Sequence, residues 1–118
     1  MSIKIDRINH SIVREISYIL MNEVKDEDIK FVTITDCKTT NDLSFAKIYF
    51  TVLDDSKRES TLKALENAKG FIRKELSEII DIRHTPELIF VYDESIEYGK
   101  KIENIIDKIN DKWYNDLN

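Results

Sequence analysis

Basic side chains gather around one glycine in the middle third of the chain. The residues concerned are Lys63, Lys69, Gly70, Arg73, Lys74, Arg83 and His84. Cations of this kind neutralise phosphate groups, and a residue without a side chain lets a sugar-phosphate backbone approach the main chain closely. Residues 57–84 carry seven cations and five anions, whereas the whole chain has a net charge of −5. The pattern therefore predicts a nucleic-acid contact at this segment.

The same segment has a helical pattern whose register fails at Gly70. Apolar residues recur at steps of three and four from Leu62 to Ile80, but Lys69 falls within the apolar stripe and Phe71 points away from it. Glycine costs roughly 1 kcal/mol against alanine inside a helix. We therefore expect two helices that meet at a kink, over about residues 57–80. The first free N–H groups of the second helix would favour a phosphate, and the kink would turn Phe71 into the core.

Two other interpretations of this segment stay open. In the first, Lys63 and Lys74 only solvate an exposed helix face, and Gly70 packs closely against the sheet. In the second, the acidic balance of the chain matters more than its basic middle, because phosphate binding usually leaves a basic footprint. Under that hypothesis the protein is an interaction module whose acidic faces dock basic proteins.

Catalysis would depend on Cys37 or on a histidine. A nucleophilic cysteine needs an adjacent base, and nothing in the local sequence activates Cys37, His10 or His84. The acidic run Asp26–Asp28 predicts a solvated turn and not a metal site, and no glycine-rich phosphate loop is present. We therefore predict that the protein is not an enzyme and uses no metal, cofactor or small-molecule substrate.

The composition suits one small domain. The chain has 118 residues, of which 42% are hydrophobic, with two glycines and one proline. We expect a single domain over residues 1–118, with the last few residues flexible. A lone cysteine indicates a reducing compartment. No signal-like N-terminus or apolar run of about 18 residues occurs, which predicts a cytoplasmic protein away from membranes.

Periodicity predicts the elements that must position the basic residues. The expected order is a helix over 4–23, strands over 31–38 and 45–52 joined as a hairpin, the kinked helices, a strand over 88–92 and a last helix. In the first strand, alternation places Thr33, Thr35 and Cys37 on one face. The apolar run Leu88–Tyr92 indicates a strand buried on both faces, inside the sheet. Helices that cover one face of a small, three-stranded mixed sheet make an α+β fold.

The last predicted helix is amphipathic. Its apolar face would consist of Ile102, Ile105, Ile106, Ile109 and Trp113.

Several ordered motifs resemble the ribosome-binding factor A family. Residues Ala68–Arg73 resemble its Ala-x-Gly-Phe-Ile-Arg signature. Arg83–Asp93 is similar to its Arg-x-x-Pro-Glu-Leu-x-Phe-x-x-Asp block, and Asp42–Tyr49 is similar to its Asp-Leu-x-x-Ala-Lys-Val-Tyr hairpin. Arg7 and the isoleucines that follow it match the family's first helix in spacing. The resemblance covers roughly residues 7–107, in the family's order.

The resemblance implies a type II KH-like domain, in which an Ala-x-Gly junction joins two helices. KH domains clamp single-stranded nucleic acid across that junction. The family implies a bacterial assembly factor that binds the small (30S) ribosomal subunit and its 16S rRNA. Such a factor assists late maturation and rRNA processing, especially in the cold. Ribosomal proteins would be further contacts, and we expect the free protein to be a monomer.

The resemblance also implies which residues form the site. It transfers to Ala68, Gly70, Arg73 and Arg83, whereas Lys69 occupies a variable position and is assigned from its charge alone. The chain departs from the family pattern in two places. Many family members have Asp-Pro-Arg after the first helix, where this chain has Asp26–Asp28. The chain also lacks the longer charged tail of some relatives. An RNA contact from residues 26–28 is therefore not expected.

Overall fold

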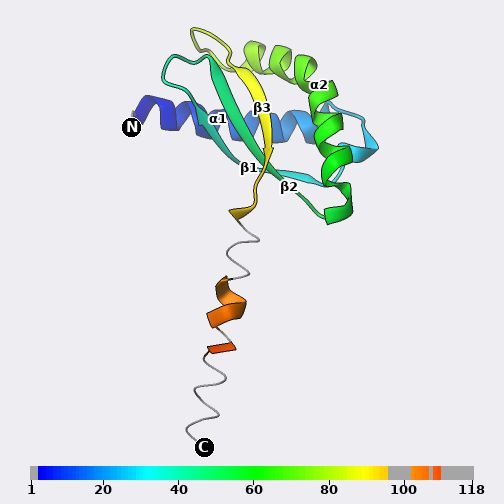
Figure 1. Cartoon of the computed structure of the whole chain (residues 1–118). Helices are drawn as coiled ribbons and strands as arrows, with labels where there is room; N and C mark the ends of the chain where they lie inside the picture. The colour runs from blue at the N-terminus through cyan, green and yellow to red at the C-terminus, as the bar shows by residue number, and fades with distance from the viewer. Residues whose placement is uncertain (1–2, 96–101, 107, 110–118) are drawn as a thin grey trace, which may run out of the picture.

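The computed structural model describes residues 3–95, 102–106 and 108–109. Three strands form a sheet, and two long helices cover one of its faces (Figure 1). The elements are α1 (Ile3–Asn22), the 3₁₀ turn η1 (Glu27–Ile29), β1 (Val32–Thr39), β2 (Phe45–Val52), the 3₁₀ turn η2 (Asp55–Lys57), α2 (Arg58–Ile79) and β3 (Glu87–Tyr92). Each expected strand is present within one residue of its predicted bounds. The α+β class with a mixed sheet is confirmed.

Helix α1 supplies one wall of the core. The isoleucine ladder predicted from periodicity is buried: Ile5, Ile8, Ile12, Ile16, Ile19 and Leu20. These side chains pack in one cluster with the inward-facing residues of the sheet, among them Ile48 and Phe50, and with Leu65, Ile72 and Leu76 of α2. Residues at steps of three and four lie on one side of a helix, so the spacing of these apolar residues is enough to predict which face of α1 is buried.

Strand β3 lies at an edge of the sheet and not in its interior. The order is β1-β2-β3, with β1 and β2 antiparallel and β2 and β3 parallel. Leu88 and Phe90 are buried, whereas Ile89 is 38% exposed. The predicted burial of β3 on both faces is therefore wrong, because helices cover only one face of the sheet and β2 takes the central place.

A bulge in β1 changes which side chains face the core. Ile34 pairs with Phe50 and Asp36 with Tyr49, so Thr35 is an extra residue in the ladder. Beyond the bulge Cys37 lies on the buried face with Ile34, although simple alternation predicted opposite faces. The hydroxyl of Thr35 donates a hydrogen bond of 2.6 Å to a carboxylate oxygen of Asp93. The bulge thus ties β1 to the end of β3.

Helix α2 is continuous through Gly70. It is α-helical from Arg58 to Ile79, although its axis bends near the middle (Figure 1). The change of direction agrees with the expected kink, but the expected division into two helices is wrong. The cost of one glycine is about 1 kcal/mol, and the packing of Leu65 on one side and Ile72 and Leu76 on the other outweighs it.

Gly70 and Phe71 both lie on the outside of α2. A Cβ atom added at Gly70 would meet nothing within 4 Å, so the interpretation that Gly70 packs closely against the sheet is wrong. Phe71 is 43% exposed. Its expected place in the core is also wrong, because the unbroken helix keeps Phe71 on the side away from the buried stripe.

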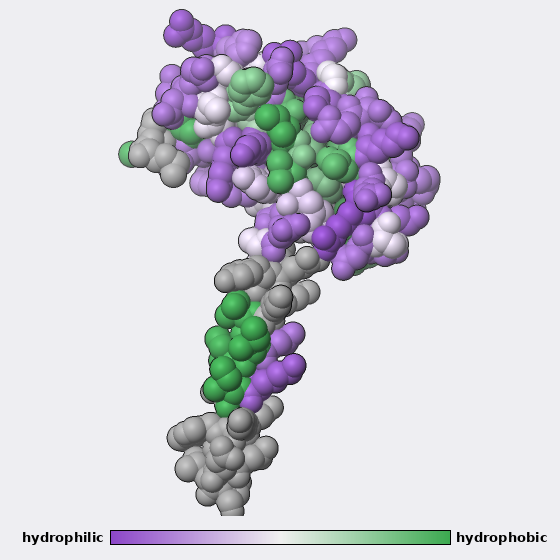
Figure 2. All heavy atoms as spheres, viewed as in Figure 1, coloured by the Kyte–Doolittle hydropathy of each residue, from purple (hydrophilic) through white to green (hydrophobic). Residues whose placement is uncertain are grey.

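The described residues 102–106 and 108–109 are helical. Figure 2 shows hydrophobic side chains along them, and the isoleucines that form this stripe are all exposed: Ile102, Ile105, Ile106 and Ile109. Trp113 and the expected flexibility of the last residues lie outside the described part of the chain. Among the described helices, none has the length and apolar character needed to cross a membrane.

Cys37 gives the fold a sensitivity to alkaline pH. Its side chain is 2% exposed, and this burial raises the pKa of the thiol to about 11. A folded-state pKa above the ordinary value of 9.0 means that the thiol stabilises the fold at neutral pH, and that this contribution is lost as the pH rises through 9 to 11. The loss amounts to at most about 2–3 kcal/mol for a shift of this size.

We expect Cys37→Ala to lose less stability than the wild-type protein between neutral pH and pH 11, because it has no thiol to ionise. Urea unfolding of both proteins across this range measures the effect. The difference between the two proteins isolates the cysteine, since lysines and tyrosines titrate equally in both. Stability curves that run parallel throughout would contradict this assignment.

Candidate nucleic-acid interface

A groove of about 520 Å³ lies where α2 meets the loop that leads into β3. It is lined by Gly70, Arg73, Lys74, Ser77, Ile82, Arg83, His84 and Thr85, and we name it the Gly70 groove. The loop is held in place because Ile80 and Ile82 pack against the core. Folding therefore gathers five of the eight basic and motif residues that the sequence singled out, from two segments of the chain.

Arg73 joins the two sides of the groove. Its Nη2 atom donates a hydrogen bond of 2.7 Å to the carbonyl oxygen of Thr85, and its Nε atom donates one of 3.2 Å to that of Pro86. Charged donors make the stronger hydrogen bonds in proteins. The sequence suggested a direct contact between Arg73 and RNA. In the structure Arg73 positions the loop that carries Arg83 and His84.

The free cations of the groove are exposed. Lys74 projects from α2, and Arg83 and His84 project from the loop. Gly70 leaves open space between them, since a Cβ atom at this position would meet nothing within 4 Å beyond its chain neighbours and the adjacent backbone of its own helix. A groove with cations on both sides and an open backbone between them suits a phosphate-bearing strand. Ser77, to which no sequence pattern points, adds a hydroxyl one turn beyond Arg73 on the same face of α2; this hydroxyl donates a hydrogen bond of 2.6 Å to the carbonyl oxygen of Lys74.

Three of the suggested residues do not line the Gly70 groove. Lys69 forms an ion pair with Glu66, one turn earlier in α2. Ala68 is half-buried and packs against the core, and Lys63 is exposed on an earlier turn. Ala68 therefore fits a packing role, while the charge of Lys69 is partly balanced within its own helix.

The expected anion site at a second helix N-terminus does not exist. Because α2 is unbroken from Arg58 to Ile79, the N–H groups near Gly70 lie in a helix interior, where they bond to carbonyls four residues earlier. Any phosphate here would be held by side chains and by close approach to Gly70.

The described surroundings of Cys37 do not activate its thiol. The high pKa of Cys37, about 11, keeps its thiol protonated at neutral pH, and a protonated thiol is a poor nucleophile. Its Sγ atom lies 3.6 Å from the Asn9 amide oxygen and 3.6 Å from the Thr39 hydroxyl. The described residues contain no group of three or more histidine, cysteine or acidic residues that could hold a metal ion.

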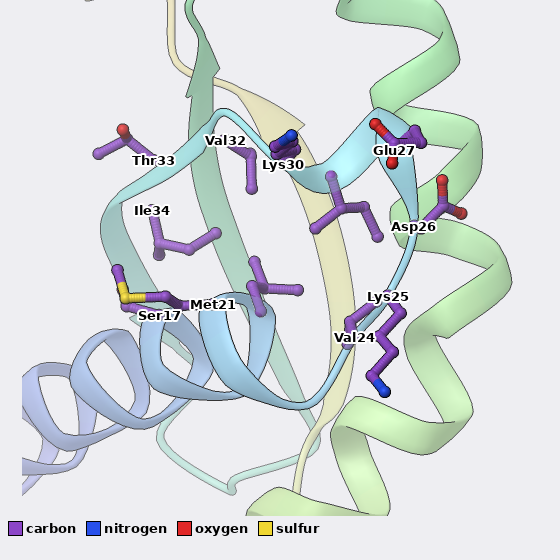
Figure 3. Close-up of a pocket in the computed structure, with 12 residues that line it drawn as sticks. Ser17, Met21, Val24, Lys25, Asp26, Glu27, Lys30, Val32, Thr33 and Ile34 are labelled. Atoms are coloured by element: carbon purple, nitrogen blue, oxygen red, sulfur yellow. The ribbon is translucent and has the colours of Figure 1, made fainter.

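A second hollow, of about 390 Å³, has a mainly apolar lining, and its charged residues are two acids, Asp26 and Glu27, and two lysines, Lys25 and Lys30 (Figure 3). It lies where the end of α1 meets η1 and the start of β1, and Met21 on its border is 82% exposed. Asp26, Glu27 and Asp28 are all exposed beside it. Asp26 accepts a hydrogen bond of 2.9 Å from the backbone N–H of Asp28. The acidic run is thus the solvated turn that the sequence predicts.

Comparison with known proteins gives consistent matches along most of the chain. The sequence pattern of the ribosome-binding factor A family matches residues 4–106. Ribosome-binding factor A of Staphylococcus carnosus is 50% identical over 108 residues, which cover 91% of this chain and 94% of that protein.

The fold has solved counterparts. The crystal structure of ribosome-binding factor A from Thermus thermophilus superposes with a TM-score of 0.69 at 18% identity, covering 75% of this chain and 93% of that one. A homology model of the T. thermophilus factor, fitted into a cryo-EM map of a 30S–RbfA complex, superposes with a TM-score of 0.59 at 18% identity, covering 80% and 97%.

Proposed function

The chain belongs to the ribosome-binding factor A family, and from this premise we propose that it binds the small ribosomal subunit and contacts 16S rRNA through the Gly70 groove. The observation that carries the proposal is the meeting of Lys74, Arg83 and His84 around the open backbone at Gly70. This exposed basic surface belongs to a chain of net charge −5. A homologous factor placed on the 30S subunit supports the choice of partner.

The groove would hold the RNA backbone and position the protein without selecting bases. A KH-type surface clamps about four nucleotides. Lys74 and Arg83 would neutralise phosphates from opposite sides, and the absence of a side chain at Gly70 would let the strand lie close to α2. Phe71, the residue after Gly70, is exposed and offers a ring on which an adjacent base can stack.

The finer biological role follows from the family. We propose a non-enzymatic factor, monomeric when free and cytoplasmic, that assists late maturation of the small subunit and rRNA processing, including growth in the cold. It would act by occupying rRNA that is not yet in its final arrangement. This role needs no bound cofactor, and the protonated, buried thiol of Cys37 fits a structural residue better than a catalytic one.

Removing the two exposed cations of the groove tests the proposal. We expect Lys74→Gln combined with Arg83→Gln to weaken co-sedimentation with small subunits by about tenfold or more, a loss of about 1.4 kcal/mol. The slope of log affinity against log salt should fall by about 1.4, since each phosphate contact on a single strand contributes about 0.7. Stability should stay near wild type, because both side chains are exposed.

The matched control is Lys47→Gln combined with Lys57→Gln. This variant removes the same charge from exposed positions in β2 and η2 that line neither the Gly70 groove nor the hollow of Figure 3, so it should bind with nearly wild-type affinity. Equal binding by the groove variant and this control would overturn the assignment of the Gly70 groove.

A second candidate is a module that docks basic ribosomal proteins without touching RNA. The observation in its favour is the exposed acidic run beside the apolar hollow of Figure 3. Neutralising Glu27 and Asp28 as Gln and Asn leaves the turn intact, because Asp26 supplies its cap. If this candidate is correct, binding to an extract survives RNase treatment and is lost in that variant. Binding lost on RNase treatment would favour the RNA interface.

A further inference from the structure

The Gly70 groove continues into two neighbouring hollows. A hollow of about 990 Å³ shares Ile82, Arg83 and His84 with the groove. A third, of about 340 Å³, shares Ile82 with both and also shares Lys4 and Ile8 with the second. The three hollows therefore adjoin one another from α2, past the loop before β3, to the outer side of α1, and we name them together the trough.

Four residues on one side of α1, which we name the α1 stripe, bring basic or hydroxyl side chains to this trough. Lys4, Arg7, Ser11 and Arg14 all line its last part. They occur at i, i+3, i+7 and i+10, a spacing that keeps them on one side of a helix. From Lys4 to Arg14 the stripe extends for about 15 Å. Arg7 and Arg14 are both exposed.

The trough has a charge opposite to that of the chain. Its lining contains six lysines and arginines, Lys4, Arg7, Arg14, Arg73, Lys74 and Arg83, and three acids, Glu15, Asp42 and Asp81, for a net charge of +3. The whole chain has a net charge of −5. Glu15 lies beside this stripe and is the one acid that α1 brings to the trough, so the α1 part of the lining has three cations against one acid.

Two of the three acids are already engaged within the protein. Asp42 accepts hydrogen bonds from the Thr40 hydroxyl at 2.8 Å and from the Ser44 backbone N–H at 3.0 Å. Glu15 pairs with the Nε atom of Arg14 at 3.2 Å. Asp42 is therefore held by its own loop, and Glu15 offsets part of the charge of Arg14. Arg7, Lys74 and Arg83 are exposed.

We propose that the α1 stripe binds the sugar-phosphate backbone of the same RNA strand, beyond the nucleotides held in the Gly70 groove. Arg7 and Arg14 contact phosphates, and Ser11 between them can donate a hydrogen bond to a phosphate or ribose oxygen. The inference rests on the proposed function and extends its site from about four nucleotides to a longer single-stranded segment. The spacing of the stripe residues is visible in the sequence, but only the fold places them near Arg83 and His84.

The test compares variants on the same RNA, using the full chain and fluorescence anisotropy. The probes are unstructured oligouridylates of about four and about twelve nucleotides, chosen to fill the groove alone or the whole trough. We expect Arg7→Gln combined with Arg14→Gln to weaken binding of the long oligomer by about tenfold and to lower its salt slope by about 1.4. The same variant should bind the short oligomer within about twofold of wild type, a small change on the affinity scale.

Two further variants separate charge from folding and from the groove. Arg7→Lys combined with Arg14→Lys keeps both charges and should bind the long oligomer as wild type does. Lys74→Gln combined with Arg83→Gln should weaken binding of both oligomers.

The outcomes for the stripe and for the groove are distinct. Long-oligomer binding by the Arg7/Arg14 glutamine variant that equals binding by the Lys47/Lys57 control would overturn this inference. Loss of binding in the Lys74/Arg83 variant would then leave the proposed function standing. Wild-type binding of both oligomers by the Lys74/Arg83 variant would overturn the groove assignment itself. No binding of either oligomer by the wild-type protein would overturn both.

Discussion

Replacing Arg73 by alanine is expected to lower the free energy of unfolding by about 2–3 kcal/mol. Hydrogen bonds from a charged donor contribute about 1.5–3 kcal/mol each, and when they are lost, new hydrogen bonds to water recover part of this energy. The change removes the bonds to the carbonyl oxygens of Thr85 and Pro86. Pro86 is buried, so its carbonyl has little access to water as a replacement partner. This residue is conspicuous in the sequence as a cation, yet its largest measurable effect should be on stability.

Urea unfolding of Arg73→Ala beside Lys74→Ala measures this effect. Lys74 is the next residue and is exposed, so its replacement should change stability by no more than about 0.5 kcal/mol. Arg73→Lys keeps the charge but cannot bond to two carbonyls with one fork, and it should recover little of the lost stability. An Arg73→Ala protein with the wild-type unfolding midpoint would show that the pair of hydrogen bonds is unimportant.

The same variants distinguish positioning from direct contact. If Arg73 acts by holding the loop, Arg73→Lys should bind RNA more weakly than wild type although the net charge is unchanged, because Arg83 and His84 lose their fixed place. If Arg73 acts mainly as a counter-charge to phosphate, Arg73→Lys should bind RNA with nearly wild-type affinity. Anisotropy with a short oligouridylate measures the difference.

Replacing Gly70 by glutamate is expected to raise stability and to abolish most RNA binding. Removing glycine from a helix interior gains about 1 kcal/mol, and the new side chain enters open space. A glutamate at this position attracts Lys74 and repels Glu66, four residues away on either side, and these effects of a few tenths of a kcal/mol offset each other. RNA affinity should fall by more than about tenfold, because a negative charge would stand where a phosphate approaches.

Urea unfolding and small-subunit co-sedimentation of the same preparations measure the two effects. Gly70→Ala is the matched variant: it should gain a similar stability and lose less binding, since it adds one methyl group and no charge. A Gly70→Glu protein that is more stable and binds RNA as wild type does would show that RNA does not approach α2 at this point. Opposite signs in the two measurements would explain why a glycine with no packing role occupies a helix interior.

Much of the fold could be predicted because its signals are local. The isoleucines of α1 from Ile5 to Ile19 and the alternation from Phe45 to Val52 are periodic patterns of neighbouring residues. In the structure these isoleucines are buried, as are Ala46, Ile48 and Phe50 on one face of β2. The ordered set of motifs, with the Ala68–Arg73 signature among them, identified the family and with it the region of the groove. These features depend only on residues within a few positions of one another.

The predictions that were wrong concern segments whose local sequence is compatible with more than one structure. Glycine at position 70 lowers helix propensity, but packing on both sides of it preserves α2 and leaves Phe71 outside. The apolar run Leu88–Tyr92 is compatible with a central or an edge strand, and only the sheet order makes β3 an edge. Propensity and hydrophobicity limit the conformations that a segment can take, whereas its contacts with neighbouring elements decide which of them it adopts.

The sequence by itself determined the element order, the core face of α1, the family and the basic character of the middle third. Only the tertiary structure decided that Arg73 clamps the loop at Thr85 and Pro86, that Thr35 reaches Asp93 across 58 residues, and that the α1 stripe adjoins the Gly70 groove. The physical reason is the range of the interactions. Periodicity predicts which face of each helix or strand is buried. A hydrogen bond or a shared groove between distant segments depends on where the fold places those segments.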